Sequence, residues 1–111
     1  MEVTEGRLGD ATTLRVAGRV DSSVSKAFEQ KVLDVVSRDG RVVVDLEEMN
    51  YISSAGLRSF IILAKHARAM NQMIALSGMR EDVTEIFEIS GLLQLFKVYA
   101  TTEAALAALA A

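Results

Sequence analysis

Cysteine and proline are both absent from the 111 residues of the sequence. Without cysteine, disulfides and thiolate metal sites are excluded, which fits a reducing compartment. Without proline, and with no Gly/Ser-rich stretch or block of like charge, nothing marks a linker between domains. The length suits one hydrophobic core, so we predict a single domain over residues 1–111.

Long apolar runs are missing as well. No stretch approaches the roughly 20 apolar residues that are needed to span a bilayer. The segment Met1-Glu2-Val3-Thr4-Glu5 has no basic region followed by an apolar one, so we find no secretory signal. The sequence therefore predicts a cytoplasmic protein with no membrane insertion.

Positive charge is scattered along the chain rather than clustered. There are 12 Lys and Arg residues against 15 Asp and Glu residues, for a net charge of −3. Proteins that bind nucleic acids usually gather Lys and Arg on one face to neutralise phosphates. We therefore expect no direct nucleic-acid partner, and any role in gene expression should act through another protein.

Turn and capping residues divide the first half of the chain. Weak alternation of polar and apolar residues on either side of Gly9-Asp10 predicts a hairpin. Capping residue types at 21–23, followed by apolar residues at helical spacing, predict a helix of about 15 residues that ends near Gly40. The run Val42-Val43-Val44 is typical of a strand buried on both faces. The predicted elements are strands at 2–7 and 13–18, a helix from about 24 and a strand from 42 to 46.

Apolar spacing also divides the second half. It predicts a helix from about Ser54 and another over residues 80–89, which Gly91 stops. Short strands are predicted at 73–76 and 96–99, and an Ala/Leu-rich helix follows. The order is ββαβαβαβα, and strands separated by helices need crossover connections. We therefore predict an α/β fold: a mixed, mostly parallel sheet of about five strands with about four helices.

Residues 45–58 are the segment most informative about function. A buried strand leads through a polar loop to two serines and then to the small residues that open a helix. Partner and ligand sites in open α/β sheets tend to lie beyond the carboxyl ends of strands. The first turn of a helix has unpaired N–H groups and the positive end of the dipole, so it tolerates a phosphate. Locally, Ser54 is either a structural helix cap or an accessible site of modification.

Three segments resemble the STAS domain family, and in particular its SpoIIAA-like anti-sigma factor antagonists. Residues 51–57, with Ser53-Ser54-Ala55-Gly56, look like the family's Asp-Ser-Ser/Thr-Gly-Leu loop, with Ser53 where the family has aspartate. Gly18-Arg19-Val20-Asp21 is similar to the family's Gly-x-Leu-Asp, and residues 90–92 are similar to its Ser-Gly-Leu after the third helix. The resemblance covers nearly the whole chain.

The resemblance implies that the protein is an anti-sigma factor antagonist that acts by partner switching. Ser54 is then the phosphoacceptor. The unphosphorylated form binds an anti-sigma factor with serine kinase activity and releases the sigma factor. Phosphorylation ends this binding, and a metal-dependent serine phosphatase restores it. The family also leaves open a non-phosphorylated STAS subunit, either accessory to a lipid-transport ABC system or part of a stressosome-like scaffold.

We call the predicted partner-binding residues around Ser54 the switch surface. Asp21 either caps the first helix or borders this surface, and Ser53 is the expected structural cap, with an alternative role as a phosphoacceptor. Asp45 either orients the loop or belongs to the same polar rim. Arg58 shares the helix face of Ser54, where it pairs with a phosphate or an acidic partner, or is only solvated. The predicted members are Asp21, Ser22, Ser23, Ser53, Ser54, Ala55, Gly56, Arg58 and Ile62.

The sequence has no convincing signal for catalysis, a cofactor or a metal. The one histidine, His66, lies 12 residues beyond Ser54. On a helix that rises about 1.5 Å per residue this is roughly 18 Å, too far for it to act as the base of the serine. The glycine that precedes the serine of a nucleophile elbow is missing, as are metal-ligand clusters and phosphate-cradling loops. We predict a protein that is not an enzyme and has no cofactor or metal; the alternative is a small hydrolase that uses Ser54.

Overall fold

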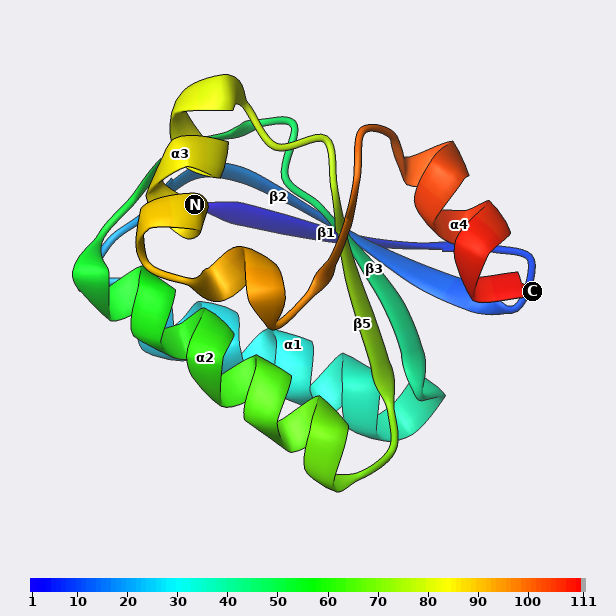
Figure 1. Cartoon of the computed structure of the whole chain (residues 1–111). Helices are drawn as coiled ribbons and strands as arrows, with labels where there is room; N and C mark the ends of the chain where they lie inside the picture. Colours follow the sequence, from blue (N-terminus) through cyan, green and yellow to red (C-terminus); the bar gives the residue numbers. More distant parts are fainter. Residues whose placement is uncertain (111) are drawn as a thin grey trace.

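The computed structural model describes residues 1–110, which form one sheet with helices on both faces (Figure 1). The α/β class, the four helices and their order agree with the prediction, but the described sheet has six strands rather than five. The elements are β1 (Glu2–Leu8), β2 (Ala11–Val20), α1 (Ser25–Asp39), β3 (Arg41–Asp45), β4 (Met49–Ile52), α2 (Ser54–Ala69), β5 (Met73–Ser77), α3 (Glu81–Ile89), a 3-10 turn (Leu92–Gln94), β6 (Lys97–Tyr99) and α4 (Thr102–Ala110).

The strand that the sequence did not predict is β4. The expected polar loop before Ser53 in fact contains this short strand, in which only Met49 and Ile52 are buried. A strand of 4 residues with two exposed residues at its centre shows no alternation of apolar and polar residues, so its pattern could not reveal it. It forms because β2 continues beyond its pairing with β3 and offers a free edge.

The sheet has the order β1-β2-β3-β5-β6, and β4 pairs with β2 outside this path. The hairpin of β1 and β2 is antiparallel, and all other pairs are parallel. Along β2, Thr12–Arg15 pair with β3 and Gly18–Val20 pair with β4, with a shift of register between Gly18 and Arg19. The parallel arrangement confirms the prediction and brings the carboxyl ends of β2 and β4 together just before α2.

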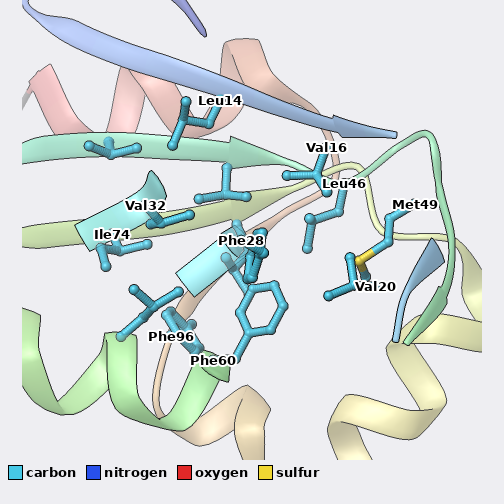
Figure 2. Close-up of a cluster of buried hydrophobic side chains, with 14 of the residues drawn as sticks. Leu14, Val16, Val20, Phe28, Val32, Leu46, Met49, Phe60, Ile74 and Phe96 are labelled. Carbon is cyan, nitrogen blue, oxygen red and sulfur yellow. The ribbon is translucent and has the colours of Figure 1, made fainter. Parts of the chain in front are cut away.

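The larger core lies between the sheet and the helices α1 and α2 (Figure 2). Four phenylalanines join its layers, because the Phe60 ring lies 5.1 Å from Phe28, 5.1 Å from Phe87 and 5.9 Å from Phe96 between centroids. A smaller core on the opposite face consists of Val43, Ala75, Ala105 and Leu109 under α4. The terminal helix therefore packs against the sheet.

Glycines end two of the helices in the predicted places. Gly40 has φ +77° and its N–H donates to the Val36 carbonyl, which closes the last turn of α1. Gly91 has φ +78° and follows Ser90 at the end of α3. Glycine adopts this left-handed conformation without the steric cost that a Cβ adds.

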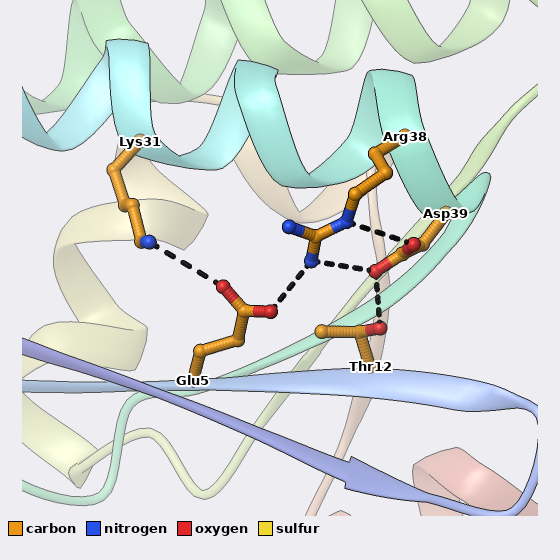
Figure 3. A network of polar contacts seen from close by, with 5 residues as sticks. All are labelled: Glu5, Thr12, Lys31, Arg38 and Asp39. Atoms are coloured by element: carbon orange, nitrogen blue, oxygen red, sulfur yellow. Dashed lines mark hydrogen bonds and ion pairs between the residues drawn. The ribbon is translucent and has the colours of Figure 1, made fainter.

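A polar network joins the hairpin to α1 (Figure 3). Glu5 of β1 accepts hydrogen bonds from Lys31 and Arg38. Arg38 also pairs with Asp39, and the Thr12 hydroxyl donates to the same carboxylate. The bonds from Arg38 and Thr12 lower the pKa of Asp39 to about 2. The network therefore links the exposed strand β1 to α1.

Candidate functional site

Backbone hydrogen bonds fix the entry to α2. The Ser53 N–H donates to the Val20 carbonyl at 3.0 Å, and the Leu57 N–H donates to the Ser53 carbonyl at 2.9 Å. The Ser53 hydroxyl oxygen accepts from the Gly56 N–H at 3.2 Å, so Ser53 is the N-cap, as predicted. Ser54 is the first helical residue rather than the cap, and it is exposed.

Gly56 brings the start of α2 into close contact with the sheet. A Cβ on Gly56 would lie 2.7 Å from Ile52 Cγ1 and 2.8 Å from the Val20 carbonyl oxygen. These distances leave no room for a side chain, so the residue must be glycine for packing reasons rather than for its φ angle. Gly56 is buried and therefore supports the switch surface from beneath instead of contacting a partner.

The loop between β2 and α1 lies beside this helix start. Val20 pairs with Ile52 in the β2–β4 ladder, which places Asp21 next to Ser53. Asp21 Oδ1 accepts from the Ser23 N–H at 3.0 Å and from the Ser23 hydroxyl at 2.6 Å. The hydrogen bonds from Ser23, together with the charge of Arg19, lower the pKa of Asp21.

The capping hypothesis for residues 21–23 is wrong. The N-cap of α1 is Val24, and no side chain caps that helix. The side chain of Asp21 is instead used within its own turn, whose backbone is closed by the Ser25 N–H donating to the Asp21 carbonyl at 2.9 Å. Of its two predicted roles, only the position at the border of the switch surface remains.

Two side chains at this border were not among the predicted site residues. The guanidinium of Arg19 lies 4.0 Å from the centroid of the Tyr51 ring, and its Nε lies 3.9 Å from Asp21 Oδ2. The cation–π contact and the ion pair together hold the Arg19 side chain beside the loop between β2 and α1. Both residues occur in the segments that resemble the STAS family, but their contact depends on the pairing of β2 with β4, and β4 was missed.

The remaining predicted residues lie along α2. Arg58 and Ile62 follow Ser54 by one and two helical turns, and both are exposed, Ile62 by 37%. Arg58 makes no ion pair within residues 1–110, so its charge is available to a phosphate or to an acidic group. Ala55 is half-buried, while Ser22 and Ser23 are exposed.

Asp45 belongs to a different surface. It is buried, and its Oδ1 accepts from the Glu47 N–H at 3.0 Å, which confirms that it orients the loop after β3. Its Oδ2 lies 3.7 Å from Arg15, in a polar cavity that also includes Thr101 and Glu103 at the start of α4. Asp45 therefore lies on the α4 side of the sheet and outside the switch surface.

The chemistry available at Ser54 is that of an exposed hydroxyl. His66 Nε2 lies 3.4 Å from the Ser37 hydroxyl, far along α2 from Ser54. Among residues 1–110 no group of three or more His, Cys, Asp or Glu side chains could hold a metal ion. Within the same residues no helix is long and apolar enough to cross a membrane. What the geometry offers is a hydroxyl open to another protein on a rigid helix start.

Comparison with known proteins identifies the same family from the whole sequence. The sequence model of the STAS domain matches residues 3–105. A Bordetella bronchiseptica protein that carries the name anti-sigma factor antagonist BtrV is 36% identical over 109 residues, which are 97% of this chain and 94% of that protein.

Solved structures share the fold at low sequence identity. One is the crystal structure of a Thermotoga maritima protein that carries the name anti-sigma factor antagonist. It has a TM-score of 0.86 at 18% identity, over 94% of this chain and 91% of that one. The Bacillus cell fate determinant SpoIIAA in its phosphorylated form has a TM-score of 0.73 at 15% identity, over 97% and 99% of the two chains.

Proposed function

The chain belongs to the STAS domain family of anti-sigma factor antagonists, and on this premise we propose that it is a partner switch controlled by phosphorylation of Ser54. In this proposal the unphosphorylated switch surface binds an anti-sigma factor that is also a serine kinase. Binding releases the sigma factor, phosphorylation of Ser54 ends the binding, and a metal-dependent serine phosphatase restores it.

The main support for the proposal is that two adjacent serines have different roles. Ser53 uses its hydroxyl to cap α2, whereas the Ser54 hydroxyl has no hydrogen-bond partner within residues 1–110 and is exposed. A kinase that modifies Ser54 therefore leaves the cap and the packing of Gly56 intact. The fold can persist while the surface changes.

The effect of the phosphate is electrostatic. It adds about −1.5 to −2 charge at pH 7, and the start of α2 tolerates this charge because of the helix dipole. A partner contact formed around a neutral hydroxyl would instead have to accommodate a hydrated dianion. A loss of about 3 kcal/mol weakens binding by somewhat more than a hundredfold, which is enough for a switch.

The proposal is tested by binding and phosphorylation assays on the full chain. With a cognate anti-sigma factor and ATP, mass spectrometry should find one phosphate on the wild type and none on Ser54→Ala. Ser54→Ala should bind the anti-sigma factor with or without ATP, and Ser54→Asp should bind more weakly than wild type. Ser37→Ala, an exposed serine on α1, is the matched control and should behave as wild type.

Two outcomes would reject this function. If both Ser54 variants bound the partner as the wild type does, Ser54 would not control binding. If the wild type bound its partner but accepted no phosphate, the protein would act as a non-phosphorylated STAS subunit, of an ABC lipid transporter or of a scaffold. Ser53, which stands where the family has aspartate, is the residue that makes this second outcome worth testing.

A further inference from the structure

A groove lies near the end of α2 that is opposite to Ser54. It has a volume of about 250 Å³ and is lined by the end of α2, the start of β5, residues 95–97 and Leu109 of α4. Ala64, the lining residue nearest to Ser54 along α2, follows it by 10 residues. At about 1.5 Å per residue this is about 15 Å along the helix axis, so the groove does not include Ser54.

The walls of the groove combine an apolar floor with positive charge. Ala67, Ile74 and Phe96 form buried parts of the lining, and Leu95 and Met73 remain 40% and 41% exposed beside it. Arg68 and Lys97 stand exposed at the lining, and neither makes an ion pair within residues 1–110. Among the described residues no carboxylate lines the groove, although the chain as a whole has a net charge of −3.

One polar group in the lining lacks a partner. Gln72 Oε1 is covered from solvent and accepts no hydrogen bond within the described residues. A buried carbonyl without a donor costs free energy, so the side chain gains by turning toward a donor placed in the groove. The neighbouring strand β6 lies at the end of the strand order, where strand edges offer further backbone groups.

From this combination we propose that the groove binds an acidic, extended segment of a second protein. An apolar side chain of that segment fills the floor, flanking carboxylates pair with Arg68 and Lys97, and a backbone N–H donates to Gln72. A fatty acid would meet the first two requirements but has no N–H to donate. Because Ser54 does not line the groove, this second partner remains bound in both phosphorylation states.

The test uses the full chain and a defined probe, a capped hexapeptide of alternating glutamate and leucine. In a titration followed by NMR of the labelled protein, the amide signals of residues 64–74 and 95–98 and the Gln72 side-chain amide should shift and saturate at millimolar peptide. Arg68→Glu combined with Lys97→Glu should weaken binding about tenfold or more. Ser54→Asp should leave the affinity unchanged.

Matched controls test whether peptide binding depends on charge at the groove or on the net charge of the protein. Lys65→Glu combined with Lys26→Glu makes the same change of net charge at exposed positions outside the groove and should leave the affinity within about twofold of wild type. A hexapeptide of alternating lysine and leucine should not bind.

The proposal is overturned if the acidic peptide causes no shifts, if its shifts lie on the switch surface, or if both double variants weaken peptide binding equally. Binding of sodium decanoate without binding of the peptide would assign the groove to a lipid and would also overturn it.

Discussion

Two helices of this protein begin at or just after a pair of serines, yet the two starts have different structures. Before α1, Ser22 and Ser23 lie in a turn that the Asp21 carboxylate organises, and no side chain caps the helix. Before α2, Ser53 caps the helix and leaves Ser54 exposed. The same residue types thus give a solvated turn in one place and a rigid, accessible hydroxyl in the other.

The difference arises from the strand that leads into each helix. β4 ends at Ile52, and the N–H of the next residue, Ser53, donates to the Val20 carbonyl of the neighbouring strand. Gly56 then lets the first turn of α2 touch the sheet. At the corresponding third helical position of α1, Ala27 is exposed and has no such contact. Close packing against the sheet, rather than the serines themselves, is what makes the start of α2 rigid.

Among variants that compare the two helix starts, Gly56→Ala should have the largest effect on stability. The added methyl group would meet Ile52 and Val20 at distances that real Cβ atoms essentially never show, so the helix start must move. We expect the free energy of unfolding to fall by about 1–3 kcal/mol, as for other overpacked sites. Ala27→Gly on α1 is the matched control and should cost no more than about 1 kcal/mol. Equal losses in chemical denaturation would mean that the start of α2 is no more tightly packed than that of α1.

Ser53→Ala should have the next largest effect on stability. Removing the hydroxyl that accepts from the Gly56 N–H should lower the free energy of unfolding by about 1 kcal/mol, the usual loss for a helix cap. Ser22→Ala, which removes a hydroxyl before α1 that caps nothing, should change it by less than about 0.5 kcal/mol. Urea denaturation of the two variants measures both values, and a reversed ranking would contradict the assigned caps.

The sequence supported prediction of the α2 start better than that of the α1 start. The start of α2 is indicated by local sequence features, namely Ser53, Gly56 and the apolar residues of α2. The resemblance to the STAS family added the position of Ser54. The capping residue types at 21–23 gave the wrong cap because the Asp21 side chain found Ser23 within its own turn. β4 and the contact between Arg19 and Tyr51 were missed because both depend on strand pairing between segments about 30 residues apart, which local patterns do not contain.

Ser54→Asp should stabilise the protein by a smaller amount. A negative charge at the first helical position interacts favourably with the helix dipole and unpaired N–H groups, so we expect a gain of about 0.3–1 kcal/mol. Ser22→Asp places the same charge two residues before the Val24 cap and should gain less. Thermal denaturation at low salt compares the two. A loss of stability for Ser54→Asp would mean that a phosphate at this position disturbs the fold, and the proposed switch would then have to include partial unfolding.

The smallest effect should be a dependence on pH at the start of α1 that the start of α2 does not share. Hydrogen bonds from Ser23 lower the pKa of Asp21 below its ordinary value of 3.8, so the bonded turn is favoured when the carboxylate is charged. Its contribution to stability is therefore present above that value and is lost as the pH falls through the lowered pKa. The start of α2 depends on a hydroxyl, which does not titrate in this range, and should not respond. NMR amide shifts between about pH 5 and 2 should move for Ser23 with the titration of Asp21, and Asp21→Asn should abolish this movement. If the Gly56 amide moved over the same range with the same midpoint, and stopped moving in Asp21→Asn, the two helix starts would be coupled through the β2–β4 pairing rather than independent.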